Sequence, residues 1–267
     1  VGENLYPRWS PDGNKIVFVY GPPTGNPYDR DLYIISSNTY TPNNITNSPN
    51  MYFDPLWSPD GSFLMFVKDG DIYRMEPDGS ELIKLAGGGG GAPALSPDGN
   101  RIAYRQSGGL YVMNVDGSNR LQIAQGSLWG PSWSPDNTRI AFSHSIPGSE
   151  GDSRINLINP DGSNRVSLAD ESTWRESSPD WSPDGTQIVF LASPIGESVM
   201  QIYIMNADGS NRNKVITSAL IGSRTVKQLD ECLDSLKNLK FSNSELKQIE
   251  KFAREEKINL WEPSSRY

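Results

Sequence analysis

His144 is the only histidine of the chain, and histidine is the side chain best suited to proton transfer near neutral pH. It ends a predicted strand and adjoins an inserted loop, a position that would suit a general base. A single histidine excludes a metal site built from several histidines. It also excludes a Ser-His-Asp triad that is accompanied by a second histidine. The sequence names no nucleophile or carboxylate partner, so a solvated histidine without a catalytic role is the simpler expectation.

Aromatic residues beside arginines in polar loops form a second chemical pattern, which could anchor a peptide or stack against sugar rings. The candidate binding residues are Tyr28, Arg30, Tyr52, Trp129, His144, Trp174 and Arg175. Phe53 and Trp129 each precede a Ser-Pro-Asp tripeptide by five residues, so they could instead fill joints between repeated units. Trp174 lies outside that register and is the better surface candidate.

The elements that must position these residues are set by that tripeptide, which occurs five times. The copies begin at Ser10, Ser58, Ser96, Ser134 and Ser182, with successive spacings of 48, 38, 38 and 48 residues. A period near 40 residues is typical of a propeller blade of four strands, which needs ~40–45 residues. Each copy is followed by an alternating strand that ends in an aromatic residue eight positions after the serine.

The turn chemistry fits this interpretation. Proline suits the second position of a tight turn and glycine the left-handed position, so Ser-Pro-Asp-Gly predicts the hairpin between the first two strands of a blade. Its aspartates are expected to form the turn rather than bind a ligand. Asp-Gly pairs at Asp78, Asp116, Asp161 and Asp208 predict a second hairpin, between the third and fourth strands. The first repeat has Ser37-Asn38-Thr39 in that place.

The repeats differ mainly in two connections. The link between the second and third strands and the link between blades both vary in length, whereas the two hairpins do not. With four antiparallel strands, both variable connections lie at the same rim of the sheets. Variable loops on a rigid frame are where binding tends to reside, so this rim is the predicted binding face.

The pattern WSPDGxxIxF followed by IYxMNxDGSN resembles the β-propeller repeat of TolB-type proteins, over roughly residues 5 to 214. The resemblance implies an all-β propeller, a bacterial periplasmic or envelope setting and usually a ring of six blades. Five motifs are present here, so either the ring closes with five blades or an upstream blade is missing. Related propellers also occur attached to hydrolases.

The net charge, the cysteine count and the distribution of apolar residues exclude several classes of partner and fold. The net charge of −8 argues against a nucleic-acid backbone as partner. Cys232 is the only cysteine, which excludes a disulfide framework. No apolar run reaches the ~20 residues of a membrane span.

Residues 1–214 are the predicted propeller. Residues 215–267 differ from them in amino-acid composition and in the spacing of their apolar residues. Leucines at helical spacing and a capping box at Ser242 and Glu245 predict two helices. This segment resembles the C-terminal end of aldo/keto reductases, where a strand leads into a helix that holds NADPH. The resemblance implies that Gly222, Ser223 and Arg224 would face the 2′-phosphate, with Gln228 and Glu231 near the adenine. Reductase activity is not expected, because the barrel and the catalytic residues of that family are absent.

The sequence therefore favours a non-catalytic TolB-like propeller that binds a protein or peptide through its variable rim. One alternative is a propeller that processes carbohydrate or peptide with His144 and nearby acids. The other is a remnant NADP(H)-binding segment fused to a propeller. No metal is expected, and no cofactor is expected unless that remnant is functional.

Overall fold

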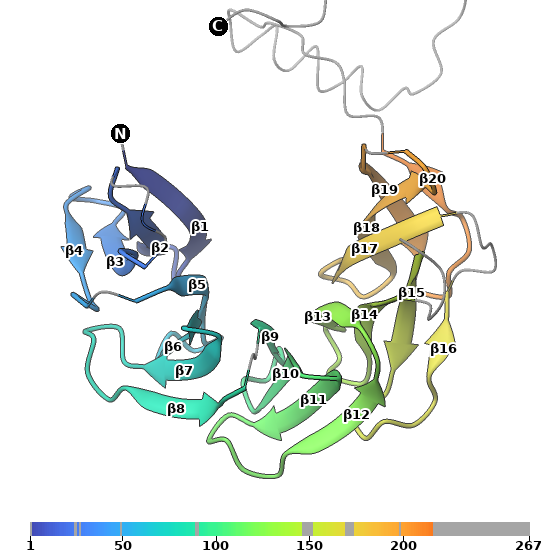
Figure 1. The fold of residues 1–267 in the computed structure, drawn as a ribbon, viewed down its shortest axis with the longest axis horizontal. Coiled ribbons are helices and arrows are strands. Elements are labelled where there is room, and N and C mark those ends of the chain that lie inside the picture. The colour runs from blue at the N-terminus through green and yellow to red at the C-terminus, as the bar shows by residue number, and fades with distance from the viewer. Residues whose placement is uncertain are drawn as a thin grey trace, which may run out of the picture. The chain divides into compact units, whose positions relative to one another are not determined.

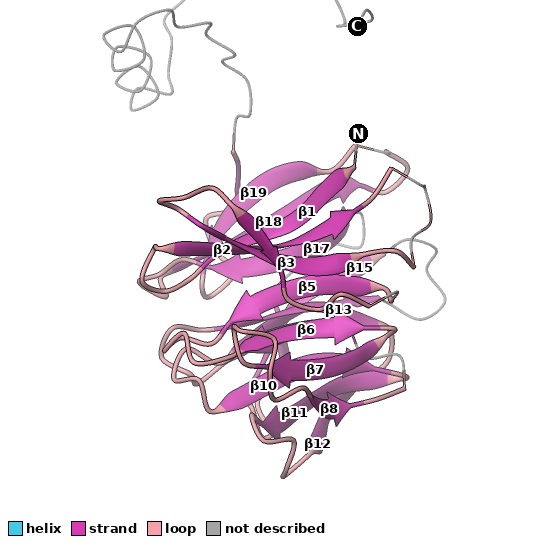
Figure 2. Ribbon diagram, turned by 90° about the vertical axis from the view of Figure 1, so that its left-hand side faces the viewer, coloured by secondary structure: helices cyan, strands magenta, loops and turns pink. Residues whose placement is uncertain are grey.

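The computed structural model describes residues 2–215 except 24–25, 27, 49, 89–90, 146–151, 169–173 and 198. Contacts divide the chain into two units, Val1–Ile216 and Thr217–Tyr267. The second unit, with the two predicted helices and the five residues proposed for NADP(H), lies outside the described residues. The described part consists of strands, turns and loops without a helix, so the all-β prediction is confirmed there (Figure 2).

The strands form four-stranded antiparallel units in chain order. The first sheet contains β1 (Glu3–Trp9), β2 (Lys15–Gly21), β3 (Asp31–Ser36) and β4 (Pro42–Asn44). The second contains β5 (Tyr52–Trp57), β6 (Leu64–Lys68), β7 (Asp71–Met75) and β8 (Ile83–Ala86). The third contains β9 (Gly91–Leu95), β10 (Arg101–Gln106), β11 (Gly109–Asn114) and β12 (Leu121–Gln125).

The remaining strands form two further units. The fourth sheet contains β13 (Leu128–Trp133), β14 (Ile140–Ser145), β15 (Ser153–Ile158) and β16 (Val166–Ser167). The fifth contains β17 (Trp174–Trp181), β18 (Gln187–Pro194), β19 (Gln201–Asn206) and β20 (Asn213–Lys214). A parallel bridge between Ser153 and Arg175 joins these two units into one larger sheet.

Consecutive sheets pack through their first strands: β1 contacts β5, β5 contacts β9, β9 contacts β13 and β13 contacts β17. Figure 1 shows the sheets of this unit following one another along an arc, with these first strands innermost and the first and fifth sheets at its two ends. This is the arrangement of propeller blades.

The Ser-Pro-Asp turns lie where the sequence predicts them, between the first and second strands. In each, the serine hydroxyl donates to the aspartate, as from Ser58 Oγ to Asp60 Oδ1 at 2.7 Å, and accepts the N–H five residues later, as from Phe63 at 3.0 Å. The aspartate also accepts an N–H two residues on, as from Ser62 at 3.0 Å. The aspartates are thus turn-forming residues, and the four Asp-Gly pairs form the predicted turns between third and fourth strands.

A feature of every first strand was overlooked in the sequence. Four residues before each motif serine the backbone has positive φ, and the next residue is proline. The pairs are Tyr6-Pro7, Asp54-Pro55, Ala92-Pro93, Gly130-Pro131 and Ser178-Pro179. The pairing register shifts at this point in all five sheets, so each pair forms a β-bulge. The repeated x-Pro at this fixed offset was the signal for it.

The hydrophobic core is divided among the joints between sheets. Among the described residues each of four buried clusters lies between two consecutive sheets. Between the third and fourth, for example, Leu110 and Val112 meet Trp133, Ile140 and Phe142. Packing between neighbours therefore supplies most of the buried apolar surface.

Candidate functional site

The strand ends that the variable connections join lie at one rim of the sheets, opposite the rim of the Ser-Pro-Asp and Asp-Gly turns (Figure 2). The longest of them in the first sheet joins β2 to β3 and carries Tyr28, whose side chain is 59% exposed. The rim is built as the loop lengths predict, because antiparallel pairing places both variable connections on the same side.

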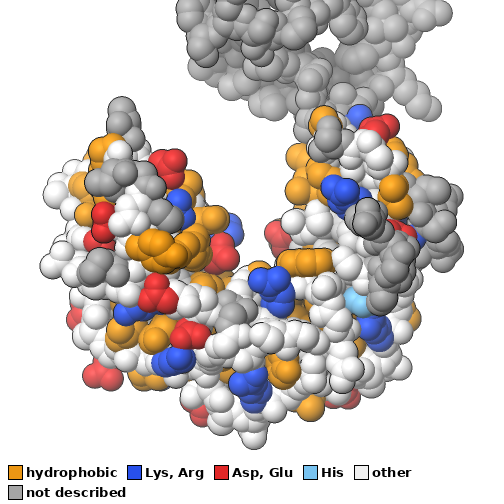
Figure 3. Space-filling view, in the orientation of Figure 1, with side chains coloured by type: hydrophobic (Ala, Val, Ile, Leu, Met, Phe, Trp, Pro, Cys, Tyr) orange, Lys and Arg blue, Asp and Glu red, His pale blue; other side chains and the backbone are white. Residues whose placement is uncertain are grey.

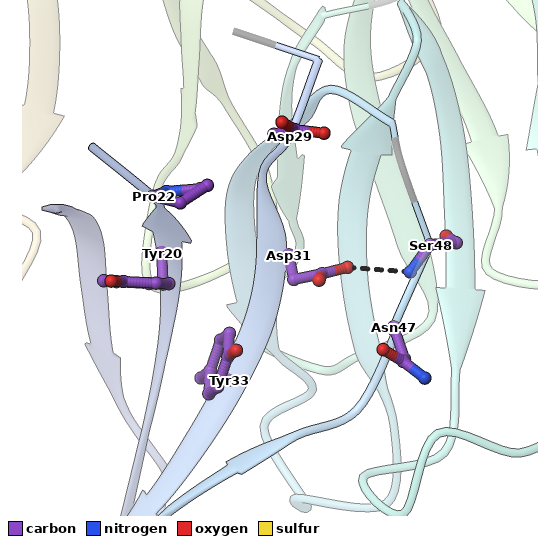
Figure 4. A pocket seen from close by; sticks show the side chains of 7 residues that line it. All are labelled: Tyr20, Pro22, Asp29, Asp31, Tyr33, Asn47 and Ser48. Atoms are coloured by element: carbon purple, nitrogen blue, oxygen red, sulfur yellow. Dashed lines mark hydrogen bonds between the residues drawn. The ribbon is translucent and has the colours of Figure 1, made fainter. Parts of the chain in front are cut away.

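A hollow of about 290 Å³ opens at this rim of the first sheet. Its walls are Tyr20, Pro22, Asp29, Asp31, Tyr33, Asn47 and Ser48. Figure 4 shows Tyr20 and Tyr33 on neighbouring strands, with Asp31 between Tyr33 and the connection that carries Asn47 and Ser48. The rings of Tyr20 and Tyr33 meet edge to face with centroids 5.5 Å apart. The hollow therefore has an aromatic wall on one side and polar groups on the other.

Asp31 is held firmly in this hollow. Its carboxylate accepts hydrogen bonds from Thr46 Oγ1 at 2.6 Å, from the Ser48 N–H at 3.0 Å and from Asn44 Nδ2 at 2.9 Å. These bonds tie the connection between the first and second sheets to β3. They fix the floor of the hollow before any ligand arrives.

Asp29 differs from Asp31, because no described residue donates a hydrogen bond to its carboxylate. Arg30 lies between the two aspartates in sequence but not in the hollow. Its guanidinium lies 3.6 Å from Glu3 and 5.5 Å from the centre of the Phe53 ring. None of the residues that line the hollow is basic. Two carboxylates beside tyrosine rings favour a cationic group such as a lysine or arginine side chain.

A second polar region lies at the joint of the fourth and fifth sheets. Glu176 is fully buried, and its carboxylate pairs with Arg212 and accepts the Ile155 N–H at 3.0 Å. Asp152 and Arg154 form a buried ion pair at 3.1 Å. These carboxylates have charged partners within the protein, so the network connects the two sheets and leaves no free charge for a ligand.

His144 is the penultimate residue of β14, and it pairs in register with Arg154 of this network. Burial, together with the charge of Arg165, lowers the pKa of its imidazole below the ordinary value of 6.5. The neutral form, which could accept a proton, is therefore favoured at neutral pH. Ser143 is the adjacent residue on the same strand, so the two side chains project from opposite faces and cannot act as nucleophile and base together.

The predicted binding residues other than Tyr52 differ in their exposure to solvent. Tyr28 and Trp129 are exposed, whereas Arg30 and His144 are half-buried. Trp174 packs edge to face on Tyr203 at 5.4 Å, against the core between the fourth and fifth sheets, so it is less of a surface residue than its register suggested. Arg175 is exposed on the strand that bridges to Ser153.

Tyr52 does not lie on the surface. Only 2% of the side chain is exposed, and its ring packs on Phe66 at 5.7 Å in the joint between the first and second sheets. Its hydroxyl shares a hydrogen bond of 2.7 Å with Ser48 Oγ. Tyr52 was placed on the rim because it follows a connection, but it is the first residue of β5 and points into the core.

The sequence did not indicate that Tyr20 and Tyr33 form a hollow. Both occupy strand positions at which a side chain normally packs against the preceding sheet. The sequence pattern therefore predicts that they are buried, whereas both are partly exposed. Among the described residues there is no group of three or more His, Cys, Asp and Glu side chains that could hold a metal ion. The described residues also include no helix that could span a membrane.

These features agree with the comparison to protein families. The sequence model of the TolB beta propeller domain matches residues 1–174 and 91–228. The chain belongs to this family. This TolB-type propeller domain has the repeated blade of the family. The hollow in its first sheet and the polar network between its fourth and fifth sheets are features of this chain.

Solved structures show the same fold. A candidate TolB from Agrobacterium tumefaciens superposes with a TM-score of 0.65 and 22% identity, over 80% of this chain and 81% of the other. Oligogalacturonate lyase from Vibrio parahaemolyticus superposes with a TM-score of 0.64 and 19% identity, over 81% of this chain and 66% of that chain. The likeness to both a TolB protein and a lyase establishes the fold and leaves the activity open.

A short stretch is similar to a different protein. Fifty residues are 44% identical to the L-glyceraldehyde 3-phosphate reductase of Escherichia coli K12, which is 19% of this chain. The chain spans 14% of the length of that reductase. So small a share does not extend to the reductase's barrel or to its activity.

Proposed function

We propose that this TolB-type propeller is a non-catalytic scaffold that binds a protein or peptide at its variable rim. The observation that carries the proposal is the hollow of the first sheet, which Asp29 and Asp31 line together with Tyr20 and Tyr33. A basic side chain of a bound peptide would place its charge near Asp29 and its aliphatic stem along the tyrosines.

Asp29 is the residue on which binding depends most in this proposal. Asp31 already accepts three hydrogen bonds from the protein, whereas the Asp29 carboxylate accepts none from the described residues. A charged hydrogen bond between Asp29 and a guanidinium or ammonium group would therefore be new on binding. Loss of such a bond costs about 1.4 kcal/mol or more, which is about tenfold in affinity.

The test selects peptides from a random display library on the purified protein and measures the recovered peptides by fluorescence polarisation. We expect lysine or arginine in the recovered peptides and at least about tenfold weaker binding to Asp29→Asn. Tyr28→Ala measures how far the site extends along the rim. The matched controls are Glu81→Gln and Tyr40→Ala, because both residues are exposed at the opposite rim. Peptides without basic residues, or equal binding by Asp29→Asn, would refute the proposal.

A second candidate is a propeller that processes carbohydrate or peptide with His144. The lowered pKa of His144 and the fold likeness to a lyase motivate it. Against it stands the paired state of the neighbouring carboxylates. Incubation with a panel of polysaccharides and peptides would detect turnover, and activity that disappears in His144→Ala would favour this function over the scaffold.

Residual binding of NADP(H) through Gly222, Ser223, Arg224, Gln228 and Glu231 is a third proposal, motivated by the reductase-like stretch. Isothermal titration with NADPH should give heat that disappears in Arg224→Ala. The absence of heat at millimolar NADPH would remove the proposal.

Two further features belong to the scaffold proposal. We place the protein in the periplasm or cell envelope, in line with its TolB relatives, which fractionation of the source cells with an antibody would check. We also propose that the five sheets are blades of one propeller that is open between the first and fifth. A disulfide that forms readily between Trp9→Cys and Val189→Cys would contradict the open arrangement.

A further inference from the structure

A second hollow, of about 390 Å³, opens between the first and second sheets at the rim of the Ser-Pro-Asp and Asp-Gly turns. This rim is opposite to the variable rim, which Figure 3 shows with the single histidine in pale blue. The walls of the hollow are Ser10, Pro11, Asp12, Lys15, Trp57, Asp60, Gly61 and Pro77. We call it the turn-rim hollow. Its volume lies within the range of about 300–1,000 Å³ that is common for ligand sites.

Trp57, in the wall of this hollow, and Trp133 of the fourth sheet occupy the same position in their joints. Each ends the first strand of its sheet and directly precedes a motif serine. The indole N–H of Trp57 donates to the carbonyl of Arg8 at 3.2 Å, and that of Trp133 donates to the carbonyl of Ala94 at 3.1 Å. Arg8 and Ala94 each stand two residues before the motif serine of the preceding sheet. The two indole rings are therefore anchored in the same way.

An arginine covers one of these two rings. The guanidinium carbon of Arg101 lies 4.8 Å from the centre of the Trp133 ring, and Arg101 Nη2 donates to the Asn137 carbonyl at 3.1 Å. Trp133 is 5% exposed, whereas Trp57 is half-buried. Arg101 stands five positions after its motif serine, and the residue at that position of the first sheet is Lys15.

Lys15 does not take the place that Arg101 takes in its own joint. The Lys15 side chain is exposed, and among the described residues its ammonium group is neither ion-paired nor placed over an aromatic ring. Gly61 stands at the position of Asn137, three residues after the motif serine, and no described residue donates a hydrogen bond to its carbonyl. The two groups that hold a guanidinium in the other joint are thus both present and unused in the turn-rim hollow.

The joint of the second and third sheets also combines an aromatic ring with a guanidinium at this rim. Phe63 occupies the position of Lys15 there, and the guanidinium carbon of Arg74 lies 5.6 Å from the centre of its ring. Leu95 stands in that joint at the position of Trp57. A guanidinium on a ring is therefore a contact that this chain uses twice at the same end of its joints.

Two carboxylates add negative charge to the turn-rim hollow. Asp12 and Asp60 belong to motif turns, where each Oδ2 atom accepts one hydrogen bond, from Asn14 Nδ2 at 3.0 Å and from Ser62 Oγ at 2.9 Å. A carboxylate oxygen can accept two hydrogen bonds, so each Oδ2 atom can accept one more. Hydrogen bonds within the turns, first from the motif serines, lower the pKa of both carboxyls to about 2, so both are ionised at neutral pH.

We propose that the turn-rim hollow binds the guanidinium group of an arginine side chain carried by a peptide. The guanidinium would stack on Trp57 and donate to the Gly61 carbonyl, with its remaining N–H groups toward Asp12 and Asp60. A guanidinium is planar and carries five donors, whereas the ammonium group of a lysine is a compact charge that does not stack. The inference goes beyond the proposed function, because this site lies at the opposite rim from the hollow of Asp29.

The test titrates the full chain with the peptide acetyl-Gly-Arg-Gly-amide, and with two peptides that carry lysine or citrulline in place of the arginine. All tryptophans are replaced by 5-fluorotryptophan, and the fluorine resonance of Trp57 is assigned with Trp57→Phe. We expect the arginine peptide to shift that resonance in a saturable way. The lysine and citrulline peptides should bind at least about tenfold more weakly, because the first lacks the planar group and the second lacks the charge.

Lys15→Arg gives the first sheet the arginine of the third. Its guanidinium should occupy the hollow, weaken binding of the arginine peptide at least about tenfold and move the Trp57 resonance toward its bound position. Lys214→Arg makes the same change at an exposed position of β20 and should do neither. Asp12→Asn combined with Asp60→Asn should weaken binding at least about tenfold.

The absence of a saturable shift up to about 10 mM arginine peptide would overturn the inference. Equal binding of the lysine or citrulline peptide, or unchanged binding by Lys15→Arg, would contradict it as well. Tighter binding of free arginine than of the peptide would exclude a peptide as the source of the guanidinium. A Trp57 resonance at its bound position before any peptide is added would mean that an arginine of this chain fills the hollow, which would also refute it. Asp29→Asn should leave the shift unchanged, and loss of the shift in that variant would assign the binding to the other hollow.

Discussion

The first and fourth sheets present the same residue types at four matching positions, and the exposure of these residues to solvent differs between the two sheets. Trp133, Ile140, Phe142 and Ile158 lie under the third sheet, whereas among the described residues no other sheet covers Trp9, Ile16, Phe18 and Ile35. Each repeat therefore encodes one of the two packing surfaces that form a joint between sheets. Whether that surface stabilises the fold or remains exposed depends on the neighbour, which the repeat itself does not specify.

The largest expected contrast comes from truncating the central phenylalanine of each face. Phe142→Ala should cost about 3–5 kcal/mol of unfolding free energy, because it leaves a cavity in a packed joint. Phe18→Ala should cost roughly 1–2 kcal/mol, since its ring is partly in water and stacks mainly on Tyr33. Urea denaturation of both variants measures the difference. Equal costs would mean that the face of Phe18 is covered in solution.

The two valines seven positions after the motif serine test the opposite end of the arc. Val17 is fully buried against the second sheet, and Val189 of the fifth sheet is 38% exposed. Val17→Ala should cost about 2 kcal/mol and Val189→Ala less than about 1 kcal/mol. Thermal and urea unfolding give the two values side by side. If Val189→Ala lowers the unfolding free energy as much as Val17→Ala does, Val189 is buried under other residues in solution.

The motif tryptophans isolate the hydrogen bond across the joint. Trp133→Phe removes the indole N–H and leaves the Ala94 carbonyl without that donor, which should cost about 1–2 kcal/mol. Trp9→Phe should change stability by less than about 0.5 kcal/mol, as surface substitutions do. The comparison fails if Trp9→Phe proves as harmful as Trp133→Phe in the same denaturation assay.

The smallest contrast concerns the motif aspartates, where we expect no difference between the sheets. The hydroxyl of Ser10, followed by the Asn14 N–H, lowers the pKa of Asp12 from 3.8 to about 2, and Ser58 and Ser62 do the same for Asp60. A carboxyl whose folded pKa is lowered stabilises the protein above pH 3.8 and loses that contribution as the pH falls through about 2.

Asp12→Asn and Asp60→Asn should therefore flatten the acid dependence of stability between about pH 4 and pH 2 to the same extent. Stability measured by urea unfolding across that range provides the check. The two sheets differ in their neighbours but not in this turn, so a larger effect of Asp60→Asn would show that the joint contributes to the turn.

The sequence predicted the features whose causes are local. Both kinds of turn depend on residues within five positions of each other, so they could be located without knowing what lies nearby. The rim with the variable connections followed from loop lengths and antiparallel pairing alone. Membership of an all-β propeller followed from the repeat.

Features that depend on direction or on a neighbour could not be predicted in this way. Tyr52 and Trp174 were assigned to the rim by their distance from a connection, but their rings point into joints. Tyr20 and Tyr33 form a hollow because no other sheet among the described residues covers them, and the repeat pattern is the same in covered and uncovered sheets. The bulge pairs such as Asp54-Pro55 were visible as a repeated x-Pro and were overlooked.

Those bulges have a consequence for how the protein can aggregate. In the first four sheets the first strand is the inner edge of its sheet, and an edge strand normally invites another strand to add to it. A left-handed residue followed by proline bends that edge and removes an N–H donor at the same point in all five sheets. Growth of the sheets by strand addition is thus blocked along the axis. The routes that remain are strand addition at the outer edges, such as β4, and association through flat faces, such as that of Phe18.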